Sequence, residues 1–120
     1  MIYLTKIYEE NIHWPEIDII VKSIAKDPKW AYQYARYVIK DRWPEGEAAI
    51  ATDSEYAYWY ATNVIKGRWS EGEKIIATDP EWSFRYARDV IVGRFPEGEA
   101  AIASDPELEN VYKYAIVNNI

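Results

Sequence analysis

Apolar residues recur along the chain in a pattern that repeats every 26 residues. When units are counted from Asp27, Asp53, Asp79 and Asp105, the apolar positions are 4, 5, 8, 9, 12 and 13. In the first full unit they are Trp30, Ala31, Tyr34, Ala35, Val38 and Ile39. Spacings of three and four residues are typical of an amphipathic helix rather than a strand. The pattern therefore predicts a first helix in each unit, over about residues 28 to 40 in the first.

Capping signals predict where these helices begin and end. The aspartate that opens each unit suits a helix N-cap, and the proline that follows three of the four suits the first helical position. A second, shorter helix is predicted to begin at position 18, through the segment EGEAAIA in the first unit. The residues that fill position 18 are Pro44, Ser70 and Pro96. Gly67 and Gly93, with Asp41 in their place in the first unit, occupy the position expected of a left-handed residue after the first helix.

One glycine recurs inside the second helix of all three full units, as Gly46, Gly72 and Gly98. Glycine costs a helix about 1 kcal/mol relative to alanine. The recurrence predicts that the backbone of a neighbouring helix approaches closely at this position.

The two ends of the chain depart from the pattern in ways that predict capping units. Positions 5 and 9 hold small residues in the full units, but the last unit has Glu109 and Lys113, which we expect to face water as an ion pair. Near the start, the sequence WPE at 14–16 arrives three residues early, which predicts a shorter first helix and a longer second one. The expected fold is all-α: a single domain, 1–120, forming a short α-solenoid of stacked helix-turn-helix repeats. Its parts are an N-terminal cap 1–26, full repeats 27–52, 53–78 and 79–104, and a C-terminal cap 105–120.

Two family resemblances follow from the repeated residues. The order of Asp-Pro, a long helix, Pro-Glu and a short helix resembles the leucine-rich-variant type of α-solenoid repeat. The segment DPEWSFRYARDVIVGRFPEGE at 79–99 resembles tandem repeats of bacteriophage and giant-virus proteins. This second resemblance covers residues 27–104 but not 1–26. It implies a viral origin and nothing about chemistry.

Composition and charge exclude several classes of function. The chain has no cysteine, which excludes disulfides and thiolate chemistry. A net charge of −6 disfavours non-specific binding of nucleic acid. There is no run of apolar residues long enough to span a membrane and no pattern of a signal peptide, so we expect a cytoplasmic protein, in the host cell if the chain is viral.

Positions that differ between the units indicate where a partner would bind. Positions 3, 7, 10, 11 and 14 fall together on a helical wheel and predict a solvent-facing strip on each first helix. Trp59 stands out, because tryptophan and arginine are enriched at interface hot spots and Arg85 occupies the same position one unit later. The alternative is that Trp59 is an ordinary partly buried aromatic residue. The predicted partner-binding residues are Trp59, Tyr37, Arg85, Arg88, Arg36, Lys40, Asn63 and Lys66.

The repeated glutamates form an alternative, acidic surface. They are Glu45, Glu47, Glu71, Glu73, Glu97 and Glu99. Pairs two residues apart point away from each other on a helix, so we interpret them as compensating the helix dipole rather than as catalytic or metal-binding carboxylates. His13 has no second histidine or cysteine with which to share a metal, so a capping or surface role is expected. We therefore expect no enzymatic activity, no metal and no cofactor.

The function predicted from these features is that of a non-enzymatic protein–protein interaction module. With the viral resemblance it becomes an inhibitor of a host defence protein, such as a nuclease or another nucleic-acid-binding protein. The module would bind through the exposed strip, or through acidic helix starts that imitate a row of phosphates. The alternative is binding of single-stranded RNA or DNA, with Tyr37 and Trp59 stacking on bases and Arg36, Lys40, Lys66, Arg85 and Arg88 contacting phosphates. A third possibility is a scaffold without a partner.

Overall fold

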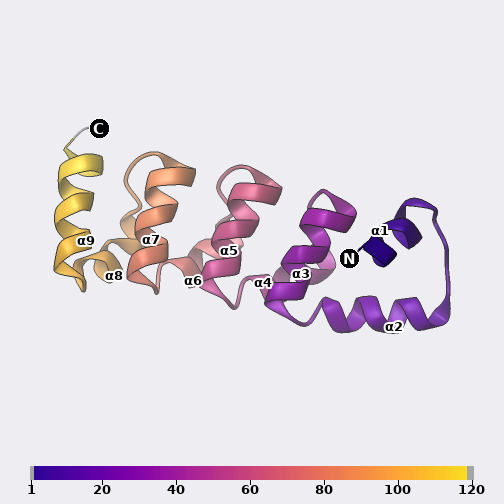
Figure 1. The fold of residues 1–120 in the computed structure, drawn as a ribbon. Coiled ribbons are helices and arrows are strands. Elements are labelled where there is room, and N and C mark those ends of the chain that lie inside the picture. The colour runs from indigo at the N-terminus through magenta and orange to yellow at the C-terminus, as the bar shows by residue number, and fades with distance from the viewer. Residues whose placement is uncertain (1, 119–120) are drawn as a thin grey trace.

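The protein is an elongated stack of helices. A computed structural model describes residues 2–118, and within that range the regular elements are all helical. The described chain measures 54 × 20 × 19 Å along its principal axes. Long helices stand side by side along the stack, and each consists of an α segment followed directly by a π segment (Figure 1). The α segments are α3 (Pro28–Tyr34), α5 (Ser54–Tyr60), α7 (Pro80–Tyr86) and α9 (Pro106–Val111). The predicted short α-solenoid is confirmed.

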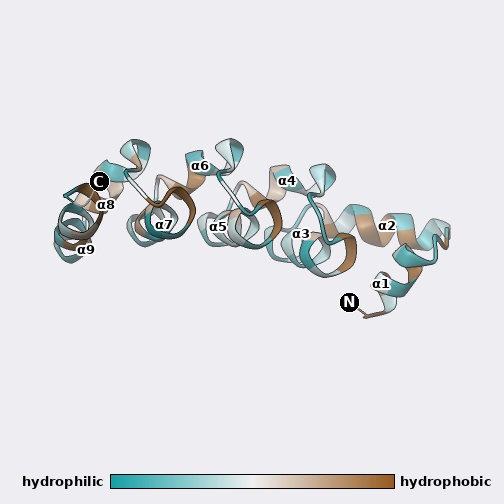
Figure 2. Cartoon of the chain, turned by 90° about the horizontal axis from the view of Figure 1, so that it is seen from above, coloured by the Kyte–Doolittle hydropathy of each residue, from teal (hydrophilic) through white to brown (hydrophobic). Residues whose placement is uncertain are grey.

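Short helices form a second layer against the long ones. They are α4 (Pro44–Ile50), α6 (Ser70–Ile76) and α8 (Glu99–Ala103), the last preceded by a 3-10 turn at Pro96–Gly98. Seen from above, the short helices lie in one row and the long helices in another (Figure 2). The core between the rows contains most of the apolar positions that the pattern predicts, including Ala31 and Tyr60, together with Ile76 of a short helix, whereas Trp30 at position 4 is 48% exposed. Alternating long and short helices thus bury one continuous core along the stack.

The aspartates that open the units are helix caps, as predicted. Asp27, Asp53 and Asp79 each accept a hydrogen bond from the backbone N–H three residues later, at 3.1, 3.1 and 2.9 Å. Asp105 accepts from the backbone N–H groups of Glu107 and Leu108. Each cap satisfies donors that the first helical turn leaves without a partner.

Each long helix changes from α to π geometry in its second half. The π segments are Ala35–Ile39, Ala61–Ile65, Ala87–Ile91 and Tyr112–Val117, where a uniform α-helix over about 28 to 40 was expected in the first unit. The left-handed residues are Lys40, Lys66 and Val92, so the prediction of Gly67 and Gly93 was wrong by one position. In the first unit one carbonyl, that of Ala35, accepts from both Lys40 N–H and Asp41 N–H. The last hydrogen bond of the π segment ends at Lys40, and the chain reverses at this left-handed residue.

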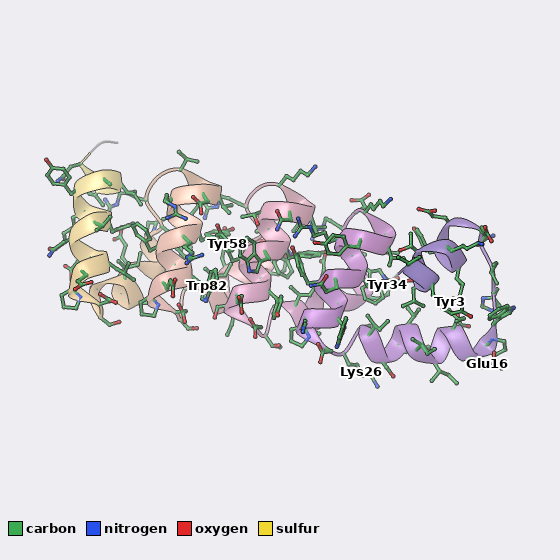
Figure 3. All side chains as sticks on the ribbon, in the orientation of Figure 1. Tyr3, Glu16, Lys26, Tyr34, Tyr58 and Trp82 are labelled. Carbon is green, nitrogen blue, oxygen red and sulfur yellow. The ribbon has the colours of Figure 1, made fainter. Side chains whose placement is uncertain are left out.

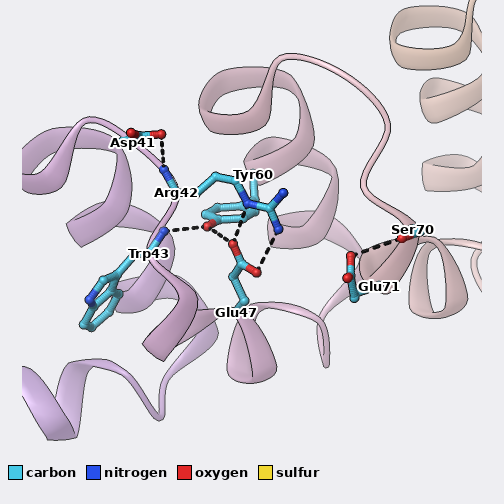
Figure 4. Close-up of polar contacts among 7 residues, drawn as sticks. All are labelled: Asp41, Arg42, Trp43, Glu47, Tyr60, Ser70 and Glu71. Carbon is cyan, nitrogen blue, oxygen red and sulfur yellow. Dashed lines mark hydrogen bonds and ion pairs between the residues drawn. The ribbon is translucent and has the colours of Figure 1, made fainter.

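A hydrogen-bonded network joins each unit to the next and accounts for the repeated Arg and Glu residues. The Arg42 guanidinium donates to both carboxylate oxygens of Glu47, at 2.9 and 3.0 Å (Figure 4). The Tyr60 hydroxyl of the next unit donates to Glu47 at 2.6 Å and accepts from the Trp43 backbone N–H at 2.8 Å. The same contacts recur twice, in Arg68, Glu73, Tyr86 with Trp69, and in Arg94, Glu99, Tyr112 with Phe95.

The repeated glycine makes room for an aromatic ring of its own unit. The Trp43 ring packs on Tyr34 with the ring centroids 4.6 Å apart. A Cβ placed on Gly46 would lie 2.6 Å from the Trp43 ring and 3.0 Å from the Ala31 Cβ. The neighbouring long helix approaches here through side-chain atoms, the Ala31 Cβ at Gly46 and the Ser83 Oγ at Gly98, and the aromatic ring three residues earlier, which the sequence did not predict, folds back over the glycine.

The terminal units differ from the repeats. Helix α1 (Ile2–Glu9) has 8 residues and α2 (Pro15–Ile24) has 10, the order of lengths predicted from the early WPE sequence. Helix α2 runs along the stack rather than across it (Figure 1). At the other end the Lys113 ammonium and the Glu109 carboxylate form the expected ion pair, with Lys113 exposed and Glu109 half-buried.

Candidate functional site

The best-defined candidate site is a groove between the first two full units. We call it the cationic groove; it lies between the π segments that extend α3 and α5 and has a volume of about 450 Å³. The residues that line it are Arg36, Tyr37, Lys40, Asp41, Asn63, Val64 and Lys66. Five of the eight predicted partner-binding residues thus meet in one place, because two adjacent units present the same helix positions to each other.

Hydrogen bonds and ring packing fix the side chains of the cationic groove. Arg36 donates to the Tyr32 hydroxyl at 2.7 Å, and its guanidinium lies 4.9 Å from the centroid of the Tyr37 ring. The Asn63 amide donates to the same Tyr32 hydroxyl at 2.9 Å. Tyr32 itself is buried, so its hydroxyl is a fixed acceptor that orients both donors. A guanidinium held in this way loses less side-chain entropy when it binds an anion.

Three cations, Arg36, Lys40 and Lys66, and one carboxylate, that of Asp41, line the cationic groove, so its positive charge is only partly neutralised. Over residues 2–118, the other five arginines each form an ion pair with a carboxylate, whereas Arg36 has no such partner. Lys66 is exposed and, within the same residues, also lacks an ion pair. Lys40 lies 3.7 Å from the Glu9 carboxylate, with both side chains more than half exposed. Exposed pairs of this kind are worth about 0 to 1 kcal/mol, so Lys40 remains available.

Trp59 does not face solvent as predicted. Its ring lies 5.0 Å from the Tyr58 ring and 6.2 Å from the Trp82 ring, and the side chain is half-buried against the core. Figure 3 shows Tyr58 and Trp82 close together between α5 and α7. The helical wheel of one unit omits Trp82 of the next unit, which is large enough to cover Trp59. Trp59 is therefore part of the contact between the second and third units.

The two remaining arginines of the predicted site lie outside the cationic groove. Arg85 pairs with Glu81 at 2.8 Å and stacks over Trp82. Arg88 donates to both carboxylate oxygens of Asp89, at 2.6 and 2.7 Å. Carboxylates therefore partly neutralise the charges of Arg85 and Arg88, whereas Arg36 has no carboxylate partner in the described residues.

Position 11 varies between units for a structural reason that the helical wheel did not reveal. Tyr32 at position 6 pairs with Asn63 of the next unit, and Tyr58 donates to the carboxylate of Asp89 at 2.5 Å. At the third interface the corresponding residues are Phe84 and Ala115, which have no polar side-chain atoms. Burial, together with this hydrogen bond to Asp89, raises the pKa of Tyr58 to about 12. The signal in the sequence was the matched change of two residues 31 positions apart.

The predicted acidic surface is divided between two kinds of glutamate. Glu45, Glu71 and Glu97 are exposed, whereas Glu47, Glu73 and Glu99 bind arginine and tyrosine in the inter-unit network. Hydrogen bonds from Arg68 and Tyr86 lower the pKa of Glu73 despite its partial burial. For Glu47, burial raises the pKa, but the bonds from Arg42 and Tyr60 outweigh burial and the pKa is lowered. The repeated carboxylates thus hold units together, beyond the dipole compensation expected of them.

Neither a metal site nor a membrane-spanning helix occurs in the part of the chain that the structure describes. Residues 2–118 contain no group of three or more His, Cys, Asp or Glu side chains placed to hold a metal ion. The single histidine, His13, lies 3.4 Å from Asp18, and both are exposed. None of the helices in this range combines the length and apolar character needed to cross a bilayer.

Comparison with known proteins found no family model, no curated protein and no solved structure that matches the chain. The resemblances to viral tandem repeats and to leucine-rich-variant repeats therefore stay predictions.

Proposed function

We propose that this protein is a non-enzymatic binding module whose cationic groove binds an acidic segment of a partner protein. The observation that carries the proposal is the convergence of Arg36, Lys40 and Lys66 while Arg36 and Lys66 lack a carboxylate partner within residues 2–118. A groove of about 450 Å³ lies within the size range of binding sites for small ligands or a few side chains.

Local charge favours an acidic partner although the whole protein is acidic. The net charge of −6 would slow the approach of any large anion, but short-range hydrogen bonds from a fixed guanidinium to a carboxylate are strong and directional. Tyr37, which is 46% exposed, and Asn63 add polar contacts beside the charges. The combination suits a short acidic segment better than a long, uniformly charged polymer.

The resemblance to viral repeats extends the proposal to a biological setting. It makes a host protein in the cytoplasm, such as a defence nuclease or another nucleic-acid-binding protein, the first partner to test. In that setting the module acts by occupying a surface of its target, and its own residues perform no chemistry.

Single-stranded nucleic acid is the competing ligand, because Tyr37 is an exposed ring beside three cations. Base stacking together with phosphate contacts is the usual mode of such binding. Anisotropy titrations separate the two ligands: one uses a labelled peptide of alternating Glu and Ser, the other a labelled single-stranded oligonucleotide, each at low and at physiological salt. Binding of the peptide and not of the oligonucleotide is the expected result.

A charge-reversal variant tests whether the cationic groove is responsible. Lys40→Glu with Lys66→Glu is expected to weaken binding of the acidic peptide at least about tenfold. The matched control is Lys29→Glu with Lys74→Glu, which makes the same change in net charge at two exposed lysines outside the groove. An equal loss in both variants would mean that only net charge matters, and the proposed site would be wrong.

A further inference from the structure

A second groove lies at the place equivalent to the cationic groove, two units further along. We call it the apolar groove; it lies between the extensions of α7 and α9 and has a volume of about 580 Å³. One wall carries Phe84, Arg88 and Val92, and the other carries Val111, Ala115 and Ile116. Positions 10, 14 and 15 of one unit and 11 and 12 of the next line both grooves, whereas Phe84 and Val111 have no counterpart in the cationic groove.

The difference arises from the pair of residues that bridges each interface. Between the second and third units the Tyr58 hydroxyl reaches across to the Asp89 carboxylate. In the apolar groove Phe84 has no hydroxyl, and the side chain of Ala115 is a single methyl group, so neither reaches across. Apolar side chains line most of the groove, and the Arg88 guanidinium lies 5.6 Å from the centroid of the Phe84 ring.

Val92, at the rim of the apolar groove, exposes an apolar side chain from a left-handed backbone position. It has φ 54° and ψ 52°, a left-handed conformation that is rare for a β-branched residue and is strained. Lysine occupies this position in the two earlier units, as Lys40 and Lys66. Because Val92 is 77% exposed, packing within the chain does not offset the strain.

Charge and size define what the apolar groove can bind. One edge of the Arg88 guanidinium donates to both carboxylate oxygens of Asp89, so the charge of this wall is partly neutralised and the wall favours a neutral, apolar group. Seven residues line the groove, whereas a standard interface between two folded chains uses roughly 20 to 30 residues a side. A second copy of the chain is therefore too large an occupant, and one bulky side chain of a short segment fits.

We propose that the apolar groove holds a bulky apolar side chain of the same partner segment whose acidic residues occupy the cationic groove. This inference rests on the proposed function. Neighbouring helices pack roughly 8 to 10 Å apart, so two unit spacings are about 16 to 20 Å. At about 3.3 Å per residue, an extended segment covers that distance in five or six residues. The partner segment is thus acidic at one end, with a large apolar residue about five or six positions away.

Two variants built from the chain's own residues test the apolar groove. Phe84→Tyr with Ala115→Asp recreates the pair seen in Tyr58 and Asp89, so it is expected to fold and to close the groove. The probes are acidic peptides that carry a leucine six residues from the acidic cluster, made in both chain directions, and the same peptides with serine instead. For the wild type, leucine is expected to tighten binding about tenfold, and the double variant is expected to lose that gain while it keeps binding of the serine peptide. A melting curve close to that of the wild type shows that the double variant is folded.

A probe without charge makes the two proposals separable. The neutral amide N-acetyl-phenylalaninamide, titrated into the full chain, is expected to shift the backbone NMR signals of Val92, Gly93 and Val111 in the wild type and not in the double variant. No gain from leucine, or a gain that the double variant keeps, overturns the apolar groove as the anchor site. If the acidic peptides do not bind but the neutral probe shifts these signals, the proposed function fails and the groove stands only as an apolar site. If the neutral probe also leaves these signals unmoved, both proposals are wrong.

Discussion

At the scale of single residues, tyrosines link neighbouring units, because the ring packs within its own unit while the hydroxyl hydrogen-bonds to the unit before it. The Tyr86 ring is fully buried, and its hydroxyl accepts from the Trp69 backbone N–H and donates to Glu73. The corresponding tyrosine of the first full unit, Tyr34, packs on its own Trp43 in the same way. It has no glutamate to bind, since the matching position in the N-terminal unit is Val21. The chain therefore contains its own control for the value of this hydrogen bond.

Tyr86→Phe is expected to destabilise the protein by about 1 to 3 kcal/mol, because it leaves a buried backbone N–H and part of a carboxylate without a partner. Tyr34→Phe removes the same hydroxyl without that consequence, and its effect should stay within about 0.5 kcal/mol. Urea denaturation of both variants measures the difference.

The effect of Tyr86→Phe should also depend on pH. The pKa of Glu73 is lowered in the fold, so the contribution of its carboxylate to stability is present above its unfolded pKa and is lost as pH falls through its folded pKa. The gap between wild type and Tyr86→Phe should therefore shrink below about pH 4. Equal effects of the two substitutions at about pH 7, where the carboxylate is ionised, would contradict the assigned role of the network.

At the scale of an element, each short helix is shaped by the aromatic residue directly before it. Trp69 is buried and packs on Tyr60 with the ring centroids 4.8 Å apart, which brings its indole over Gly72. Glycine weakens the helix, but any side chain at this position would collide with the indole. Gly67, in the loop before α6, has a negative φ, and a Cβ added there would meet no atom beyond its chain neighbours within 4 Å. The two glycines of one unit thus have opposite roles.

Gly72→Ala is expected to destabilise the protein by about 1 to 3 kcal/mol, since displacing the indole outweighs the roughly 1 kcal/mol gained in helix propensity. Gly67→Ala is expected to stabilise it by about 0.4 to 1 kcal/mol, because alanine restricts the unfolded chain and meets no obstacle. Thermal melts followed by circular dichroism give both signs. A stabilising Gly72→Ala would show that the ring does not require the glycine.

At the scale of the whole molecule, stability depends on whether the residues at each interface match. The two interfaces between full units, and the interface between the last full unit and the C-terminal cap, use the same tyrosine, glutamate and backbone N–H contacts, so units are interchangeable in that respect. The pair at positions 6 and 11 differs from one interface to the next and makes the order of units matter. Tyr58 matches Asp89, and Phe84 lies opposite Ala115.

Deleting residues 53–78 brings Tyr32 opposite Asp89 and so preserves a tyrosine–carboxylate pair. Deleting residues 79–104 brings Tyr58 opposite Ala115, which leaves the hydroxyl without that partner and replaces the Trp82 contact with Leu108. Both deletions remove one whole unit, and both are expected to leave a helical protein. The first should melt cooperatively at a higher temperature than the second, as measured by circular dichroism or calorimetry. The reverse order would show that the pair at positions 6 and 11 does not set the fit between units.

The sequence by itself determined the features that depend on neighbouring residues and on period. The 26-residue repeat, the aspartate caps, the alternation of long and short helices and the departures at both ends were all predictable, because helix periodicity and capping act within a few residues. The candidate groove was also partly predictable, since Arg36, Tyr37 and Lys40 lie on one face of a helix.

Only the tertiary structure decided which residues that face meets. Trp59 is covered by Trp82, Asn63 is bound to Tyr32, and Glu47 is bound to Tyr60, by contacts that join residues 13 to 31 positions apart. The π turns and the left-handed Lys40, Lys66 and Val92 were likewise visible only in the structure. A helical wheel describes one helix in isolation, whereas burial and charge pairing depend on the side chains that the adjacent unit brings within reach.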